Sequence, residues 1–404
     1  MSARLLHGNM MLRPWRRLAI LALGLGIIKV TAVRQLPSLE AREGPVAGGT
    51  ATAGATADTV RLVAVGDLMC HTSQLDDART TTGFDFRPAF APVRPYLSRA
   101  DLAIGNLETV TAGPEERFTG YPQFNCPVEY LDAIGDAGFD VITTANNHSL
   151  DRRFLGVERT IQALEDRGLR HTGTARTAEE RDRPLIAEVK GMRIAVLAYT
   201  YGTNGIALPA GKPFAVNLID TLAMARDIRQ ARAASADAII VSLHWGTEYE
   251  RQPNIVQRRV ATFLAGQGVE VILGSHPHVL QPLEWLPGLA GRTLVIYSLG
   301  NFFSGQRKRY TDSGLILGLS LIRDGVGQPV RVDAVQVVPT YVARRPSYRI
   351  VAVTDALEAM VRGDTTDPHA ARTESGRVRE VWMETIAHLV DSSAGITVAP
   401  RLPR

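Results

Sequence analysis

Short apolar runs alternate along the chain with segments of helical periodicity, and most of the runs end in polar residues. Five runs predict buried strands: 59–65, 100–105, 139–144, 238–243 and 269–273. Segments with helical start and stop signals predict helices at 128–138, 155–167, 219–234 and 254–265. Strands that alternate with helices indicate a layered α/β fold with the helices outside.

The later part of the chain is richer in strand signals. Segments 185–189 and 193–199, separated by Lys190-Gly191, predict a hairpin. Segments 292–299, 315–322 and 330–342 are rich in β-branched residues and predict antiparallel strands. We expect these late strands to form a second sheet packed on the first, which makes the predicted fold a four-layer α/β/β/α sandwich.

The amino terminus has the pattern of an export signal. Arg13, Arg16 and Arg17 precede an apolar run at 18–28, so residues 1–35 are predicted to be a signal anchor or a cleaved signal peptide. Residues 36–58, rich in Gly, Ala, Thr and Pro, are a predicted flexible linker. The main domain is placed at 59–345 and a helical extension at 346–404. The domain is then extracytoplasmic, held at the cell membrane by the anchor or secreted if the signal is cleaved.

Composition and charge narrow the function classes. Hydrophobic residues make up 45% and charged residues 21% of the chain, as in ordinary globular proteins, and the net charge is +4. Lys and Arg are scattered without a basic stripe interleaved with aromatics, so no nucleic-acid binding is predicted. Cys70 and Cys126 are too few for a disulfide framework; one bridge, a thiolate ligand at Cys70, or two unpaired thiols are the options.

Polar motifs follow the predicted strands. They read Gly66-Asp67, Asn106-Leu107-Glu108, Asn146-Asn147-His148, His244-Trp245-Gly246 and His276-Pro277-His278. Carboxylate and amide oxygens and imidazole nitrogens are ligands of zinc, manganese and iron. Because the carboxyl ends of parallel strands meet at one edge of a sheet, the motifs predict a single metal site there.

The individual residues differ in what they offer. Asp67 can bind a metal or cap the loop that follows it, and Glu108 can bridge two ions. His276 and His278 lie two residues apart around a proline, which suits a preformed metal cradle. A cation held by these groups would polarise a phosphoryl or carbonyl oxygen, with His148 as a candidate proton donor to the leaving group.

These motifs resemble the CapA-type poly-γ-glutamate synthesis proteins, which are similar to calcineurin-like metallophosphoesterases. The resemblance covers roughly residues 60–342. It includes three further stretches: Ser149-Leu150-Asp151 after the third motif, Gly274-Ser275 before the fifth, and Tyr297-Ser298-Leu299-Gly300-Asn301-Phe302 at the end of a late strand. It implies a fold of metallophosphoesterase type and one or two divalent ions (Mn, Zn or Fe). Its implied ligands are Asp67, Glu108, Asn147, His244, His276 and His278.

The resemblance also implies roles and partners. Asp67 and His148 are the candidate catalytic residues, and the candidate substrate-binding residues are Asn106, Asn146, Trp245, Glu248 and Asn301. The implied partner is an anionic polymer such as poly-γ-glutamate or its precursor. Further implied partners are membrane synthase subunits and, through the anchor, the membrane itself.

Two departures from the pattern leave more than one function open. Metallophosphoesterases carry a histidine two residues after the first aspartate, where this chain has Met69, and aspartates where it has Asn106-Leu107-Glu108. The favoured hypothesis is a metal-dependent hydrolase acting on the polymer or its precursor in capsule synthesis or export. The alternatives are a non-catalytic accessory subunit of a membrane synthase complex and a secreted phosphatase unrelated to capsule.

Overall fold

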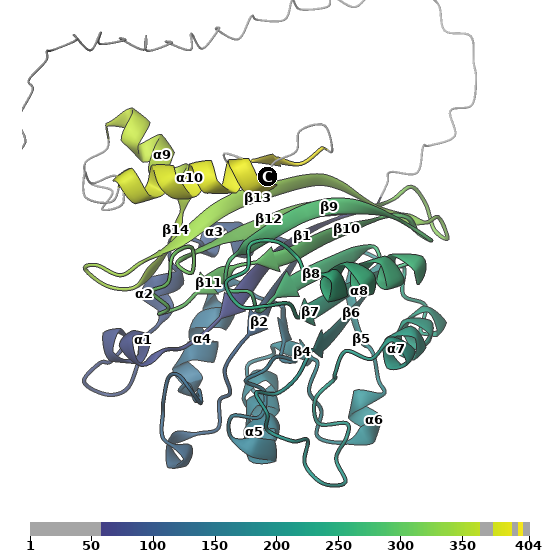
Figure 1. Cartoon of the computed structure of the whole chain (residues 1–404), viewed down its shortest axis with the longest axis horizontal. Coiled ribbons are helices and arrows are strands. Elements are labelled where there is room, and N and C mark those ends of the chain that lie inside the picture. The colour runs from purple at the N-terminus through teal and green to yellow at the C-terminus, as the bar shows by residue number, and fades with distance from the viewer. Residues whose placement is uncertain (1–57, 364–374, 390–394, 399–404) are drawn as a thin grey trace, which may run out of the picture. The chain divides into compact units, whose positions relative to one another are not determined.

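Two β-sheets packed face to face between helices form the framework of the protein (Figure 1). The computed structural model describes residues 58–363, 375–389 and 395–398. The predicted signal segment, 1–35, and all but the last residue of the predicted linker lie outside these residues. Within the described residues, no helix is both long and apolar enough to cross a membrane.

The first sheet draws its strands from both ends of the described chain. Its order is β14-β13-β12-β1-β2-β3-β4, with β11 beside β1 and β15 beside β13. The strands are β1 (Asp58–Leu68), β2 (Leu102–Leu107), β3 (Val141–Thr143), β4 (Arg170–Thr172), β11 (Asn301–Phe303), β12 (Ser313–Arg323), β13 (Val330–Ala343), β14 (Arg349–Ala352) and β15 (Thr397–Val398). Strands β1 to β4 are parallel, whereas β12 runs antiparallel to both β1 and β13.

The second sheet uses the middle of the chain. Its order is β5-β6-β7-β8-β10-β9. The strands are β5 (Leu185–Val189), β6 (Met192–Thr200), β7 (Ala238–His244), β8 (Val271–Ser275), β9 (Leu280–Gly288) and β10 (Gly291–Leu299). The four inner strands are parallel, and the antiparallel strands β5 and β9 form the two edges.

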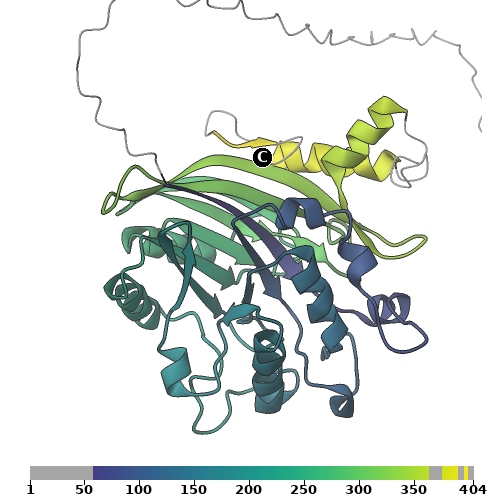
Figure 2. The same cartoon turned by 180° about the vertical axis from the view of Figure 1, so that it is seen from behind.

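Helices cover the outer faces of both sheets (Figures 1 and 2). They are α1 (Thr72–Asp77), α2 (Arg87–Phe90), α3 (Arg94–Leu97), the 3-10 turn η1 (Pro114–Glu116), α4 (Val128–Ala137), α5 (Arg153–Glu165), α6 (Ala178–Arg181), α7 (Thr221–Ala233), α8 (Ile255–Gly266), α9 (Val353–Arg362) and α10 (Ser375–Leu389). Helix α10 contacts β9 and β13, one strand from each sheet.

Three apolar clusters separate the layers. Phe90, Tyr130 and Val65 belong to the cluster between α1–α4 and the outer face of the first sheet. The cluster between the sheets includes Leu62 and Ile240, and the outer cluster of the second sheet joins α7 and α8 to β7. This helix–sheet–sheet–helix order confirms the predicted four-layer α/β/β/α sandwich.

The assignment of the late strands to a second sheet was wrong for two of the three strands. Strands β12 and β13 join the first sheet, where Leu62 of β1 lies opposite Leu319 of β12. Strand β10 joins the second sheet and pairs in parallel with β8, so its predicted antiparallel pairing holds only towards β9. The reason is that β1 is largely buried, so the backbone N–H and C=O groups along its side away from β2 need the partners that β12 supplies.

Candidate metal centre

The polar motifs converge where the carboxyl ends of the two sheets meet. Asp67 is the last residue but one of β1, Glu108 directly follows β2, and Asn147 follows β3, all in the first sheet. His244 ends β7, while His276 and His278 directly follow β8 in the second sheet. The predicted ligands are all at least nine-tenths buried.

Two glycines allow this convergence. A Cβ at Gly66, next to Asp67, would lie 1.9 Å from the carbonyl oxygen of Gly300. A Cβ at Gly274, two residues before His276, would lie 2.0 Å from the carbonyl oxygen of Tyr297. A side chain at either position would push apart the backbones that place the ligands, so the glycines in these motifs are steric requirements.

Asp67 joins the two halves of the site. Its Oδ1 accepts a hydrogen bond from Asn106 Nδ2 (2.8 Å), which comes from the first sheet. Its Oδ2 accepts one from the backbone N–H of His276 (3.3 Å) and lies 3.2 Å from Nδ1 of His278. The carboxylate is therefore held by groups from both sheets, and its orientation is fixed before any ligand binds.

Glu108 is fully buried, and neither of its carboxylate oxygens has a hydrogen-bond partner among the described residues. Oε1 lies 3.6 Å from Nε2 of His244 and 3.8 Å from Nε2 of His278, which is too long for hydrogen bonds. Burial, and then the charges of Asp67 and Glu248, raise the pKa of Glu108 well above its ordinary value. An unpartnered buried carboxylate is costly, and a bound cation would remove that cost.

The imidazoles that face Glu108 are disposed as neutral ligands. Burial, followed by His278, lowers the pKa of His276 to about 3, and burial lowers the pKa of His244 well below its usual value. Nδ1 of His276 has no partner among the described residues. Metal ligation requires a neutral imidazole with a free nitrogen, and His276 meets that condition, whereas both nitrogens of His244 lie within hydrogen-bond distance of side chains, Nε2 of Asn147 and Nδ1 of Ser275.

The donor atoms form overlapping groups. One ligand atom from each of Glu108, His244 and His276 lies within 4.8 Å of the others, and the same holds for Asp67, Glu108 and His278. Two ligand atoms that bind one zinc at about 2.1 Å lie within about 4.2 Å of each other, so only a small contraction is needed. Glu108 belongs to both groups, as a bridging ligand would. Glu248, which is exposed, forms a third group with His276 and His278.

Asn147 and His148 lie beside this cluster, and both are buried. Oδ1 of Asn147 lies 2.8 Å from Nε2 of His244, and its Nδ2 donates to Asn204. Nδ1 of His148 lies 2.7 Å from Oδ2 of Asp151, which orients the ring, while its Nε2 lies 3.4 Å from Nδ2 of Asn204. The pairing leaves Nε2 as the nitrogen that can hold a proton for a substrate.

The predicted substrate-binding residues occupy different surroundings. Asn106 contacts Asp67, and Asn301 Oδ1 lies 3.1 Å from His278 Nδ1, so both support ligands. The side chain of Asn146 donates to Leu107 O and accepts from the backbone N–H of His148. Nε1 of Trp245 donates to Tyr297 O in the outer core of the second sheet. Of the five, Glu248 alone is exposed.

Several residues of the site were missed in the sequence. Tyr201 is half exposed, and its ring centroid lies 4.6 Å from that of His276. Oγ of Ser275 lies 3.2 Å from Nδ1 of His244. Asp151 and Asn204 hold His148 and Asn147. Ser275 and Asp151 were within the quoted motifs, whereas Tyr201 and Asn204 lie in a loop without a recognisable pattern.

At the position two residues after Asp67, where metallophosphoesterases carry a histidine, this chain has a buried methionine. Met69 is buried, and its sulfur lies 3.6 Å from Oγ of Ser304. His71 does not replace it, because its Nδ1 accepts a hydrogen bond from the backbone N–H of Gly305 and it belongs to none of the donor groups. Cys70 is likewise outside the donor groups; it and Cys126 are buried free thiols.

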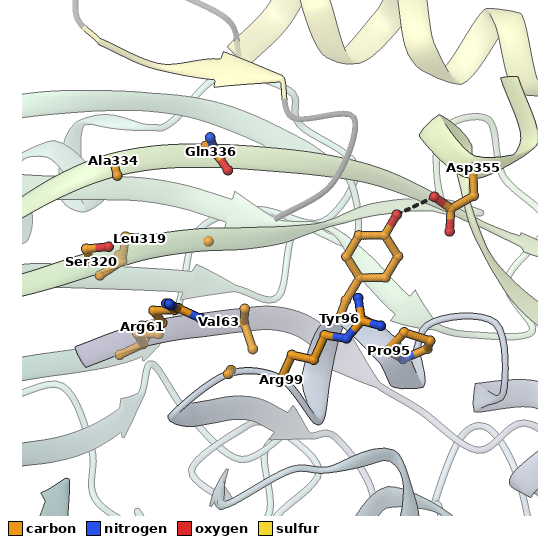
Figure 3. A pocket seen from close by; sticks show the side chains of 13 residues that line it. Arg61, Val63, Pro95, Tyr96, Arg99, Leu319, Ser320, Ala334, Gln336 and Asp355 are labelled. Atoms are coloured by element: carbon orange, nitrogen blue, oxygen red, sulfur yellow. Dashed lines mark hydrogen bonds between the residues drawn. The ribbon is translucent and has the colours of Figure 1, made fainter. Parts of the chain in front are cut away.

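A separate cavity of about 240 Å³ lies on the outer face of the first sheet, between α3 and α9 (Figure 3). Arg61 and Val63 of β1 and Gln336 of β13 line it, with Arg99 and the Tyr96–Asp355 hydrogen bond at one end. None of the predicted site residues lines this cavity.

Comparisons with known proteins place these residues in context. The family model described as "Bacterial capsule synthesis protein PGA_cap" matches residues 61–306. The chain is 28% identical over 272 residues to "Capsule biosynthesis protein CapA" of Bacillus anthracis, covering 64% of this chain and 63% of that protein. It is 29% identical over 247 residues to "PGA biosynthesis protein CapA" of Bacillus subtilis (strain 168), covering 59% and 62%. The chain thus spans less than two thirds of the length of these relatives.

Solved structures also match. The 5'-nucleotidase precursor from Thermus thermophilus matches with a TM-score of 0.42 and 13% identity, covering 81% of this chain and 58% of that one. The calcineurin-like phosphoesterase YfkN from Bacillus subtilis matches with a TM-score of 0.42 and 13% identity, covering 82% and 99%. At these scores neither activity nor substrate carries over.

Proposed function

Because the chain belongs to the bacterial capsule synthesis protein family PGA_cap, we propose that it is a metal-dependent hydrolase of capsular poly-γ-glutamate synthesis or export. Its substrate is the polymer or its precursor, cleaved at a γ-glutamyl amide or at a phosphoester. The chain's similarity to two CapA proteins, named for capsule and PGA biosynthesis, supports the choice of pathway.

Glu108 carries the hydrolase part of the proposal. A fully buried carboxylate with two unpartnered oxygens, in one group with His276, whose Nδ1 also lacks a partner among the described residues, is unfavourable unless a cation binds. Asp67, Glu108, Asn147, His244, His276 and His278 would hold one or two Mn, Zn or Fe ions. When bound, a divalent cation supplies Lewis-acid polarisation of a phosphoryl or carbonyl oxygen.

The chain's own residues supply the proton and the orientation. His148, held by Asp151, presents Nε2 as the donor to the leaving group. Asn204 contacts both Asn147 and His148 and keeps the ligand and the donor at a fixed separation. Tyr201, which lies over His276, covers one side of the cluster and limits access of water.

The proposed location is the outer face of the cell membrane. The basic residues Arg13, Arg16 and Arg17 before an apolar run support an anchor or a cleaved signal. An extracytoplasmic position would give the site access to a capsular polymer and to membrane synthase subunits.

The test begins with the metal. The purified full chain is incubated with Mn²⁺ or Zn²⁺, its bound metal is measured by mass spectrometry, and the loaded protein is assayed on phosphoesters and γ-glutamyl peptides. We expect at least one ion per chain and metal-dependent cleavage of one substrate class. The His276→Ala/His278→Ala variant should lose both.

A matched histidine variant controls for general damage. His388 in α10 lies 2.9 Å from the carbonyl oxygen of Arg251 and belongs to none of the donor groups, so His388→Gln should keep the metal. A wild-type chain that takes up metal but cleaves neither substrate class would refute the hydrolase.

A second candidate function is a non-catalytic accessory subunit of a membrane synthase complex. Met69 in place of a histidine and Asn106 in place of an aspartate favour it, because both reduce the charge and number of ligands. In that case Asp67→Ala and His276→Ala proteins would still restore capsule to a strain that lacks the chain. Loss of capsule with a folded variant would exclude this candidate.

A further inference from the structure

Two loops beside the metal centre are fastened to each other by reciprocal cation–π contacts. Nζ of Lys308, in the loop between β11 and β12, lies 3.6 Å from the ring centroid of Tyr249 in the loop between β7 and α8. Cζ of Arg251, in the second loop, lies 4.2 Å from the ring centroid of Tyr310 in the first. Each loop therefore supplies one cation and one ring, so two separate cation–π contacts hold the two loops together.

Both tyrosines have an unusual backbone conformation. Tyr249 has φ of 68° and Tyr310 has φ of 70°, in the left-handed region that non-glycine residues rarely occupy. Strain of this kind persists only where the surroundings hold it, and it gathers at ligand clamps and active sites. Here it aims each ring at the cation of the opposite loop.

Both loops are also tied to the metal centre. The backbone N–H of Tyr249 donates to the carbonyl oxygen of Pro277 (2.8 Å), between the two ligand histidines, and its ring centroid lies 6.1 Å from that of His278. Asn301, which contacts His278, donates through Nδ2 to Gln306 Oε1 (3.0 Å) and to Thr311 O (2.7 Å). The loops therefore form one rim of the site.

This rim carries an excess of positive charge. Arg307, Lys308 and Arg309 are exposed and form no salt bridge with the described residues, while Arg344 donates to the carbonyl oxygen of Gln306. Among the carboxylates near the rim, Glu384 interacts electrostatically with Arg251 and Arg309, and Glu248 and Glu250 belong to the same loop as Tyr249. Glu384 is also paired with Arg377, and Glu248 is hydrogen-bonded to the Tyr249 hydroxyl, which together with burial raises the pKa of that tyrosine.

We propose that this rim, the cationic clamp formed by Tyr249, Arg251, Arg307, Lys308, Arg309 and Tyr310, is a binding subsite for a carboxylate-bearing polymer, a chain of γ-linked glutamates. Arg307, Lys308 and Arg309 pair with successive carboxylates of the bound chain and lead it to the metal centre. The choice of polymer rests on the proposed function, whereas the charge and rigidity of the rim do not. Fixed loops lose less conformational entropy on binding than free ones.

Binding of a defined oligomer to the full chain tests the clamp. The probe is a fluorescent γ-linked oligoglutamate about ten residues long, followed by anisotropy with the metal-loaded protein. We expect Arg307→Gln/Lys308→Gln/Arg309→Gln to bind at least about ten-fold more weakly, as the loss of three exposed charge pairs allows. The dependence of affinity on salt should fall as well.

Matched variants separate the clamp from net charge. Arg61→Gln/Arg94→Gln/Arg99→Gln removes three cations away from the clamp, two that line the outer cavity and one at the start of α3, and should bind as the wild type does. Arg307→Gln alone removes a charge without touching a ring and should give a smaller loss, whereas Lys308→Arg should preserve binding.

The outcomes are distinct. Oligomer binding that the clamp variant leaves unchanged, equal losses in the two triple variants, or no binding by the wild type would each overturn the subsite. Cleavage of a short γ-glutamyl substrate or a phosphoester by the wild type tests the hydrolase separately. A chain that fails to cleave but loses oligomer binding in the clamp variant would refute the hydrolase and keep the subsite.

Discussion

The two sheets contribute different chemistry to the same site. The first sheet supplies oxygen donors, namely Asp67, Glu108 and the amide of Asn147, whereas the second supplies the imidazoles of His244, His276 and His278. The oxygen side includes Glu108, an unpartnered carboxyl group whose ionised form is costly to bury, while on the imidazole side burial lowers the pKa of His244 and His276. Neither sheet alone presents a complete set of metal ligands.

Because the oxygen ligands and the imidazole ligands come from different sheets, the geometry of the site depends on how the two sheets pack. The strands of each sheet must end at the same level, and the sheets must pack face to face, before the donors come within 4.8 Å of one another. The apolar cluster between the sheets, with residues such as Leu62 and Ile240, therefore sets the distance between the oxygen and the nitrogen ligands. Metal binding should in turn hold the two sheets together.

The largest effect is expected from Asp67→Ala, which removes the residue that links the two sides. The variant leaves the amide of Asn106 and the backbone N–H of His276 without their acceptor. We expect loss of bound metal and a fall of about 2 kcal/mol in the free energy of unfolding of the metal-free protein. Mass spectrometry and urea denaturation measure the two quantities, and a variant that keeps stoichiometric metal would contradict the link.

Glu108→Gln should separate metal binding from stability. The change removes a carboxyl group whose ionised form is costly to bury and whose charge a cation would pair with, so metal affinity should fall at least about a hundred-fold while the metal-free protein becomes more stable. Glu270→Gln is the matched control, because Glu270 is also buried but accepts hydrogen bonds from Arg232 and the backbone N–H of Ile239. The control should keep the metal and lose stability. Thermal unfolding, measured with and without metal, should show a higher melting temperature than the wild type for metal-free Glu108→Gln and a lower one for metal-free Glu270→Gln.

Two adjacent asparagines on the oxygen side should respond differently. Asn146→Ala removes the hydrogen bonds to Leu107 O and from His148 N–H and should lower the free energy of unfolding by about 1–3 kcal/mol without changing metal stoichiometry. Asn147→Ala should mainly weaken metal binding. Metal titration and denaturation of both variants would detect this difference. If Asn146→Ala and Asn147→Ala changed metal affinity and stability equally, the prediction would be wrong.

The smallest effect is expected on the imidazole side, from Trp245→Phe. The indole donates one hydrogen bond, to Tyr297 O, and faces the core behind the site. We expect a loss of about 1 kcal/mol in the free energy of unfolding, with metal content and substrate affinity unchanged. A change in substrate KM would instead support the substrate contact predicted from the motif.

The local pattern of the sequence was sufficient for the central strands and helices. Apolar runs predicted β7 and β8, and the hairpin of β5 and β6 followed from Lys190-Gly191, where both residues have positive φ. Strand β9 was missed because Pro282 and Pro287 argue against a strand. It is an edge strand, where proline is tolerated.

Partners far apart in the sequence could not be predicted in the same way. The pairing of β12 with β1 joins residues more than 200 positions apart, and nothing in the apolar pattern of β12 specifies that neighbour. Asn146 and Asn147 are identical in type and adjacent, yet one holds backbone groups and the other lies against His244. Only the contacts made in the folded chain distinguish them.

Strand β1 also acts as a spacer. It begins at Asp58, the first described residue, and carries Asp67 near its other end. Nine residue steps of extended chain span about 30 Å. With the proposed anchor preceding Asp58, the metal centre would stand about a bilayer core's thickness from the point where the tether enters the domain. A pull on the chain at Asp58 and a ligand held at Asp67 would therefore act on opposite ends of the same strand.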